Sequence, residues 1–217
     1  MGKLNGGILG PIRGKVGAVV GSVSGGQNII KKMPSSYADK KSESQLSQRS
    51  KFQNTLRWAQ ALNGVISAAF IEKPSKQSSF NAFMSANAGI GVITETPVWN
   101  SFKISKGSLA CPDVAMNTTA NTATLRFAWN DDSDGSAKLS TDRIIAVAIN
   151  PVNKQVVMTD GSASRLSETL TLNLPASMQG VDLQTYVFAK RADGKKASNS
   201  RRTGLGRAGS ELAGSVQ

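Results

Sequence analysis

The sequence predicts an α+β protein in which an N-terminal β-hairpin arm and a helical hairpin precede an immunoglobulin-like antiparallel β-sandwich. Three features of the sequence indicate this order. Residues 7–25 combine Ile, Leu and Val with a glycine at every third or fourth position. Residues 42–71 carry apolar side chains at helical spacing, and beyond Pro97 the apolar side chains alternate with a period of two. We therefore expect an arm with two helices, a sandwich and a small-residue tail, over residues 1–97, 98–203 and 204–217.

A β-hairpin is expected at the end of the glycine-rich segment. Val16–Val23 and Asn28–Met33 are rich in β-branched residues, and Gly25-Gly26 between them tolerates the positive φ angles of a tight turn. Glycines weaken an isolated strand, but they let another backbone come close, and an apolar strand edge can extend the sheet of a partner. We interpret the segment as a self-assembly arm that uses Gly14, Val16, Gly17, Val19, Val20, Gly21, Ile29 and Ile30.

Two helices are expected between the arm and the sandwich, packed together as a hairpin. The first spans residues 42–71, where Ser42 and Gln45 form a capping box. The second spans residues 79–87, after Pro74 has ended the first. The predicted buried stripe of the first helix consists of Phe52, Leu56, Ala59, Leu62, Ile66, Ala69 and Phe70.

Short strands separated by turn sequences are expected after Pro97. The clearest are residues 125–131, 143–150, 154–160, 168–174 and 183–191, and residues 103–116 and 197–201 add further strands at the two ends. Such regularly spaced short strands are typical of an immunoglobulin-like sandwich, although no cysteine pair supports an antibody-type domain. The predicted core comprises Phe127, Trp129, Ile145, Val147, Leu172 and Val187.

The composition argues against an enzyme. Histidine is absent and Cys111 is the single cysteine, so the commonest general base, the commonest metal ligand and any internal disulfide are excluded. Cys111 lies between apolar neighbours, which predicts a buried small residue rather than a nucleophile. We therefore expect no catalytic residue, no cofactor and no enzymatic activity.

Two segments match known binding motifs only in part. GILGPIRGK lacks the first glycine of a P-loop, where Leu9 stands, and Val16 replaces the Ser or Thr. Asn130, Asp132 and Asp134 match the first half of a calcium loop, but Thr141 occupies the position of the bidentate Glu. The sequence leaves open whether these three residues bind calcium or form a polar turn between strands.

The positive charge is concentrated in the first part of the chain. The formal net charge is +12, and residues 1–97 carry 12 basic against 4 acidic side chains. A chain this basic tends to meet an acidic partner, and no aromatic residue is interleaved with the basic runs to stack on bases. Any contact with nucleic acid is therefore expected to be non-specific, through the phosphate contacts Lys31, Lys32, Lys40, Lys41, Arg49 and Lys51.

No signal peptide or membrane span is expected. Pro11, Arg13 and Lys15 interrupt the first apolar stretch, and the uncharged run Val16–Ile30 is too short and too polar to cross a bilayer. We expect a protein made in the cytoplasm, with no membrane partner.

Several segments resemble a known family. MGKLNGGILGPIRGKVGAVVGS, IIKKMPSS, QLSQRSKF, SSFNAFMSAN and YVFAKRADGKKASNS resemble a family of uncharacterised proteins of about this length from Bacteroidota and their phages. The resemblance covers nearly the whole chain, and the block Gly14–Gly21 is its most specific part. Members of the family carry an aromatic residue followed by Lys shortly after this block, where the present chain has Ser22-Val23-Ser24. The resemblance implies organisation and lineage, but no chemistry.

The sequence therefore predicts a non-enzymatic structural protein, present in many copies in a phage virion or similar particle and bound to itself or to other subunits. The alternative hypothesis is a sequence-independent protein associated with DNA or RNA. A surface adhesin is a third hypothesis, which the missing signal peptide disfavours.

Overall fold

The computed structural model describes residues 3–4, 12–24, 26–33, 39–88, 96–118 and 123–208. The chain divides into two compact units, Met1–Glu43 and Ser44–Gln217. The division lies at residue 43 rather than at the expected residue 97, because the helices share a buried core with the strands that follow them.

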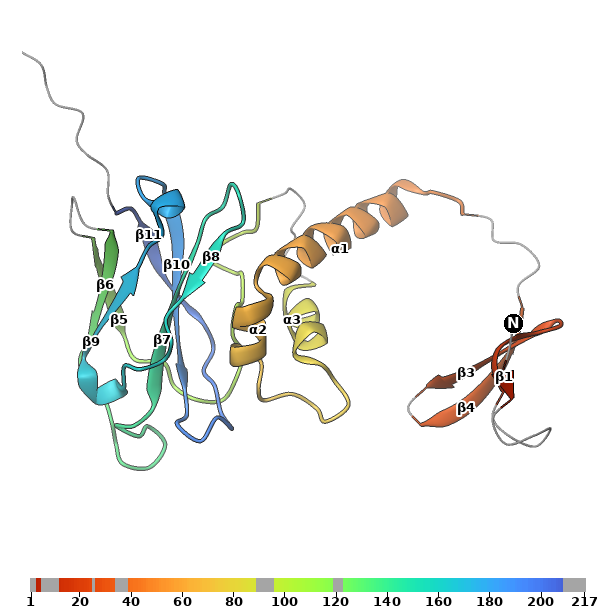
Figure 1. Cartoon of the computed structure of the whole chain (residues 1–217), viewed down its shortest axis with the longest axis horizontal. Helices are drawn as coiled ribbons and strands as arrows, with labels where there is room; N and C mark the ends of the chain where they lie inside the picture. Colours follow the sequence, from red (N-terminus) through yellow and green to blue (C-terminus); the bar gives the residue numbers. More distant parts are fainter. Residues whose placement is uncertain are drawn as a thin grey trace, which may run out of the picture. The chain divides into compact units, whose positions relative to one another are not determined.

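The first unit contains a four-stranded antiparallel sheet, here called the N-terminal sheet, with the strand order β1-β2-β3-β4 (Figure 1). Ser24 pairs with Gln27, which confirms the expected hairpin turn between them. The expected single strand Val16–Val23 is wrong, because Val16 pairs with Val19 across a second two-residue turn in which Gly17 has a φ of 56°. The strands are β1 (Lys3–Leu4), β2 (Ile12–Val16), β3 (Val19–Ser24) and β4 (Gln27–Lys32).

Three helices begin the second unit, namely α1 (Glu43–Ala61), α2 (Asn63–Ala69) and α3 (Ser79–Asn87). The helix expected over residues 42–71 is interrupted at Leu62, whose φ and ψ of −90° and 10° leave the helical region just before the poor helix formers Asn63 and Gly64. The helix expected over residues 79–87 is confirmed as α3, and the side chain of Ser78 caps it by accepting a hydrogen bond from the Asn81 N–H at 3.1 Å.

In the first part of α1, the side chains that are buried lie on a different face of the helix from the one expected. Phe52 was assigned to the stripe but is 60% exposed, whereas Trp58, which was not assigned to it, is completely buried. The later part of the prediction is correct, because Leu62 and Ile66 are buried. The observed buried positions follow the helical spacing of three and four residues: Thr55, Trp58, Ala59, Leu62, Val65, Ile66, Ala69 and Phe70.

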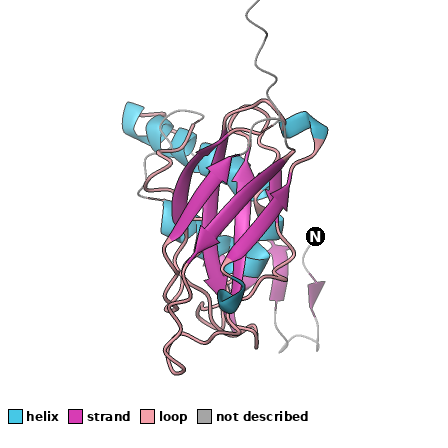
Figure 2. Ribbon diagram, turned by 90° about the vertical axis from the view of Figure 1, so that its left-hand side faces the viewer, coloured by secondary structure: helices cyan, strands magenta, loops and turns pink. Residues whose placement is uncertain are grey.

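Seven strands of the second unit form two antiparallel sheets (Figure 2). One sheet has the order β5-β6-β9 and the other has the order β11-β10-β7-β8. The strands are β5 (Val114–Thr118), β6 (Thr124–Trp129), β7 (Arg143–Ile149), β8 (Val156–Met158), β9 (Thr169–Asn173), β10 (Leu183–Lys190) and β11 (Arg201–Gly206). Two 3-10 turns, Arg165–Ser167 and Ala176–Met178, flank β9. The five clearest expected strands are therefore all present.

The two end segments differ from expectation. Residues 103–116 do not form one strand, because β5 begins only at Val114, beyond Pro112, which has no N–H to donate to a ladder. Of residues 197–201, Ala197 and Ser198 form single bridges, with Ala197 opposite Lys190, and β11 begins only at Arg201. The expected tail from residue 204 begins later, since β11 continues to Gly206 and Ala208 is buried; residues 209–217 lie outside the described residues.

The sheet β11-β10-β7-β8 is buried on both faces, which gives this unit three layers (Figure 1). Along β7, Ile144 and its alternate neighbours face the three-stranded sheet, whereas Ile145 and Val147 pack against the helices. All six predicted core residues are buried. Ile145 and Val147, however, lie under the helices rather than between the two sheets. Trp58, Trp99 and Phe102 form edge-to-face aromatic contacts within the same helix-facing core.

A carboxylate ties the helical layer to the sandwich. Glu72 follows α2, and its Oε1 accepts the N–H groups of Ser108 at 3.1 Å and Ala197 at 2.9 Å. Partial burial alone would raise the pKa of Glu72, but these hydrogen bonds outweigh it and hold that pKa below its ordinary value. The ionised carboxylate therefore stabilises the junction of three segments that lie far apart in sequence.

A buried guanidinium organises the loops beside β6 and β7. Arg165 is completely buried; it is paired with Asp132 and donates to the Ala110 carbonyl oxygen at 2.8 Å. Asp142, also completely buried, lies 3.6 Å from Arg165 Nη2 and 3.0 Å from Arg191 Nε. The indole N–H of Trp129 donates to the Arg165 carbonyl oxygen at 2.7 Å. This hydrogen bond links the hydrophobic core to the charged cluster.

We predict that Trp129→Ala lowers the free energy of unfolding by about 3–5 kcal/mol, because it leaves a large cavity and removes the indole hydrogen bond. Chemical denaturation of the full chain measures the change. Arg126→Ala is the control, because Arg126 is exposed on the same strand, and it should change the free energy by less than about 0.5 kcal/mol. A loss below about 1 kcal/mol for Trp129→Ala would contradict a core role.

We predict that Glu72→Gln flattens the acid dependence of stability. The folded-state pKa of Glu72 lies below the unfolded value of about 4.3, so its contribution is complete above that value and is lost as the pH falls through the folded-state pKa. Unfolding curves recorded between about pH 6 and pH 3 should converge for the two proteins at the acidic end. Parallel pH profiles would contradict the proposed junction.

Candidate assembly interface

The N-terminal sheet has two chemically different faces. Residues directly opposite one another on paired strands share a face, and successive residues alternate between faces. We call the first the apolar face; it carries Gly14, Val16, Val19, Gly21, Val23 and Ile30, with Asn28 and Lys32 at its margin. We call the second the basic face; it carries Lys15, Val20, Ser22, Ile29 and Lys31.

Two glycines shape the apolar face. Gly14 has a φ of 90°, a conformation that side chains rarely adopt, and it lies in β2 two residues after Ile12. The main chain of Ile12 packs directly over Gly21, where a Cβ atom would overlap the Ile12 carbonyl oxygen. The close backbone approach expected from the glycine spacing is thus present within this sheet itself.

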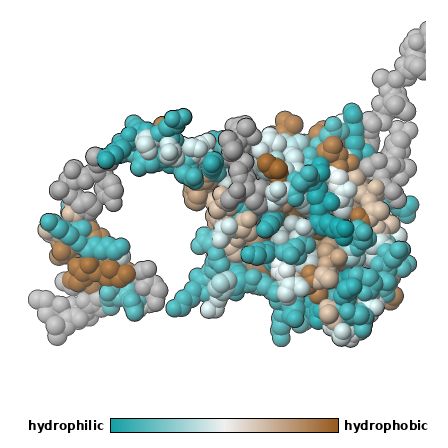
Figure 3. Space-filling model, turned by 180° about the vertical axis from the view of Figure 1, so that it is seen from behind, coloured by the Kyte–Doolittle hydropathy of each residue, from teal (hydrophilic) through white to brown (hydrophobic). Residues whose placement is uncertain are grey.

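Apart from Ile12 over Gly21, the described residues of the first unit leave most of the apolar face uncovered. Gly21 is the one buried residue among those of the first unit whose burial is described. Val16, Val23 and Ile30 are 39%, 43% and 59% exposed. Figure 3 shows hydrophobic surface gathered on this small sheet. Exposed apolar side chains that gather on one face favour contact with another surface.

The predicted phosphate contacts lie on several different elements. Lys31 and Lys32 are neighbours on β4 and therefore point to opposite faces of the sheet. Lys40 and Lys41 are exposed between β4 and α1. Arg49 and Lys51 belong to α1, in the second unit. Strand alternation therefore separates Lys31 from Lys32, although the two residues are adjacent in the sequence.

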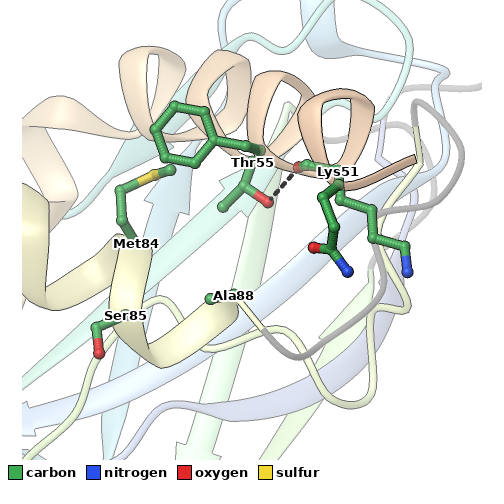
Figure 4. A pocket seen from close by; sticks show the side chains of 7 residues that line it. Lys51, Thr55, Met84, Ser85 and Ala88 are labelled. Carbon is green, nitrogen blue, oxygen red and sulfur yellow. Dashed lines mark hydrogen bonds between the residues drawn. The ribbon is translucent and has the colours of Figure 1, made fainter. Parts of the chain in front are cut away.

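A groove between α1 and α3 was not predicted from the sequence. It has a volume of about 270 Å³ and lies between Lys51, Phe52 and Thr55 of α1 and the facing residues of α3 (Figure 4). The residues of α3 and its end that line it are Met84, Ser85 and Ala88. Thr55 Oγ1 donates to the Lys51 carbonyl oxygen at 2.9 Å, so this hydroxyl is occupied within α1. The groove is mainly apolar, and it exists because the stripe begins at Thr55 and leaves Phe52 outside the core.

The residues considered for catalysis or calcium serve structural contacts. Burial raises the pKa of the half-buried Cys111 thiol to about 11, so it is a poor nucleophile. Asp132 is paired with Arg165 and with Lys138, whose Nζ lies at 3.2 Å. The N–H groups of Lys138 and Ser136 hold the pKa of Asp134 at about 2. Among the described residues, no group of three or more Cys, Asp and Glu could hold a metal ion.

No helix within the described ranges is both long enough and apolar enough to cross a bilayer.

The chain was compared with known proteins. The model of a family of unknown function, DUF6266, matches residues 11–204. The match therefore includes most of the N-terminal sheet and both sheets of the second unit, and it is consistent with the resemblance to an uncharacterised family. The comparison with curated proteins found no match.

We predict that Gly21→Val destabilises the N-terminal sheet by about 1–3 kcal/mol or more, because the added side chain overlaps the Ile12 main chain. Hydrogen exchange of the β3 and β4 amides measures the loss of protection. Ser22→Val is the matched control, since it adds the same side chain at the next, exposed position. Equal exchange in the two variants would contradict this packing.

Proposed function

The chain belongs to the DUF6266 family of unknown function, and we propose that it is a non-enzymatic structural protein that assembles in many copies through its N-terminal sheet. The observation that carries this proposal is the apolar face, where Val16, Val23 and Ile30 have no covering layer within the described part of their unit. Burying apolar surface contributes about 25 cal/mol per Å², so covering this face in an assembly favours association.

We also propose that the second unit is an immunoglobulin-like sandwich. The strand order β5-β6-β9 against β11-β10-β7-β8 supports this, because its first, second and fifth strands form one sheet and the other four form the second. A sandwich of this kind hosts many functions, so the proposed role rests on the N-terminal sheet and not on this fold.

We further propose that the assembly is a virion, or a similar particle, of a phage that infects Bacteroidota. The resemblance of segments such as Gly14–Gly21 to proteins of Bacteroidota and their phages supports this setting. The chemistry also supports a structural role, since Asp142, Glu72 and Asp134 serve an ion pair, a junction between segments and a turn.

Non-specific nucleic-acid binding is the second candidate, and the basic face favours it. Lys15 and Lys31 flank Val20 in one row across the sheet, and both are exposed. The described residues of the four strands include Lys and Arg but no Asp or Glu. This face could approach a phosphate backbone while the opposite face is covered by protein.

We predict that replacing Val23 and Ile30 together by Thr abolishes assembly of the full chain. Threonine keeps the β-branched shape, so the sheet persists while its apolar surface is lost. Light scattering as a function of concentration measures the assembly. The wild-type assembly should persist at high salt, because apolar burial is not screened. A wild-type chain that stays monomeric at all concentrations would overturn the proposed function.

The matched variant replaces Lys15 and Lys31 by Thr on the basic face. We predict that it leaves assembly unchanged. If the second candidate is correct, binding to random duplex DNA should weaken, and the slope of log K against log salt should decrease by about 1.8 for two lost phosphate contacts. Loss of assembly in this variant, with assembly intact in the Val23 and Ile30 variant, would reverse the assignment of the two faces.

A further inference from the structure

Strand β4 is an open edge of the N-terminal sheet. Among the described strands it pairs only with β3. The Met33 N–H donates to the Ala18 carbonyl oxygen at 2.8 Å, and the bonds alternate along an antiparallel strand, so the odd positions of β4 bond to β3. The N–H and C=O groups of Asn28, Ile30 and Lys32 therefore face outward. They form a template for a further strand.

The middle of this edge carries an exposed apolar side chain. Ile30 is 59% exposed, against 39% for Val16 and 43% for Val23, and it belongs to the apolar face of the sheet. Residues 27–33 lie between the turn that contains Gly26 and Pro34, which has no N–H to donate. Ile30 is the middle residue of this range. A strand added to the edge would therefore lie directly beside it.

A second copy of β4 matches this edge when the two strands run antiparallel about a two-fold axis at Ile30. Ile30 then lies opposite Ile30 of the second copy, and Asn28 lies opposite Lys32 on either side of the axis. The outward positions of one strand meet the outward positions of the other, and each such pair exchanges two hydrogen bonds. All of residues 27–33 are paired, and the two apolar faces lie on the same side of the joined sheet.

The two lysines of β4 favour this arrangement over others. Lysine on an edge strand limits unwanted pairing, because like charges directly opposite each other are destabilising. An axis at Lys31 would place the Lys31 side chains of the two copies opposite each other, and a parallel pair in register would place Lys31 and Lys32 beside their own copies. An axis at Ile30 instead places Lys31 opposite Ile29. Lys32 then lies opposite the uncharged Asn28.

An axis at Ile29 pairs the two strands less completely. It would place Ile30 opposite the polar Asn28, and Lys32 would lie opposite Gly26, beyond the end of the second strand. Fewer residues are then paired, and the exposed Ile30 side chains of the two copies no longer meet.

The other open edges of the chain match β4 less well. The even positions of β9 bond to β6, so its outward backbone groups belong to Thr169, Thr171 and Asn173. In an antiparallel pair with β9, Ile30 would lie opposite one of these polar side chains, and parallel pairs are less stable per residue. β8 has 3 residues, whereas β4 has 6. The partner that fits β4 best is therefore β4 itself.

We propose that two copies of the chain pair through β4, antiparallel and with Ile30 at the two-fold axis, to form one continuous sheet. This inference rests on the assembly role proposed above and identifies the contact through which two N-terminal sheets join. The pairing closes at two copies, because both use the same edge. The two apolar faces join into one larger face, which favours contact with further copies.

Disulfide formation between full-length chains tests the register, with Cys111→Ser in every chain. We expect Ile29→Cys in one chain and Lys31→Cys in the other to form a mixed disulfide, because these positions lie opposite each other at a Cα separation of about 4.5 Å. Each variant alone should form no disulfide, since its two copies are diagonal neighbours about 7–8 Å apart. A disulfide between two copies of position 29 or of position 31, or the lack of a mixed disulfide, overturns the proposal.

Two charge variants at Asn28 test the orientation without a cysteine. Asn28→Asp places a carboxylate opposite Lys32 of the second copy at both ends of the pair. We expect the dissociation constant of the dimer to fall about threefold or more, and Asn28→Lys to raise it by a similar factor. Analytical ultracentrifugation of dilute protein at low salt measures both. In a parallel pair position 28 lies beside its own copy, so weakening by Asn28→Asp, or no effect of either variant, overturns the proposal.

The edge pairing and the proposed function fail in different ways. A chain whose assembly needs Val23 and Ile30, but which forms no mixed disulfide between positions 29 and 31, overturns the edge pairing and leaves the proposed function standing. A wild-type chain that stays monomeric at all concentrations overturns both.

Discussion

The structure of the second unit depends on one constraint, which is that the sheet β11-β10-β7-β8 must be covered on both faces. β7 and β10 are buried at nearly every position and most of their side chains are apolar, so exposing either face to water would carry a large free-energy cost. The three-stranded sheet covers one face and the helices cover the other. The helices therefore cannot form a separate domain, because removing them would expose Ile145, Val147 and Phe188. Glu72 and Asn87, which hold the helical segments to residues 103–108, follow from this requirement.

The strands were predictable because their periodicity is local. Turn sequences around Arg143–Ile149 and Leu183–Lys190 marked their ends, and the apolar runs marked their burial. The second covering layer was not predictable in the same way. A continuous apolar run indicates burial on two faces, but it does not say which segment provides the second cover. The error over Phe52 and Trp58 has a related origin, since two apolar stripes fit the start of α1 and only packing selects between them.

The contacts of the buried polar groups could not be predicted from the sequence for a different reason. Arg165 contacts Asp132, Asp142 and Ala110, and these partners are separated from it by tens of residues. No spacing rule connects such positions, so their pairing appears only when the fold brings them together. The glycines of the N-terminal segment show the opposite case. Their spacing indicated a close backbone approach, and Gly21 has one, although the approaching chain is Ile12 of the same sheet. Likewise, Lys31 and Lys32 looked like one cluster until strand alternation divided them between two faces.

Open strand edges also cannot be recognised in a sequence, because only the order of the strands in the sheet decides which strand lies at an edge. The short β8 and the polar outer residues of β9 are features that natural sheets use to limit unwanted pairing. The side of the sandwich between them nevertheless retains a groove, whereas the β5–β11 side is closed. The apolar face of the N-terminal sheet and this groove are both products of strand order, which no local periodicity of the sequence records.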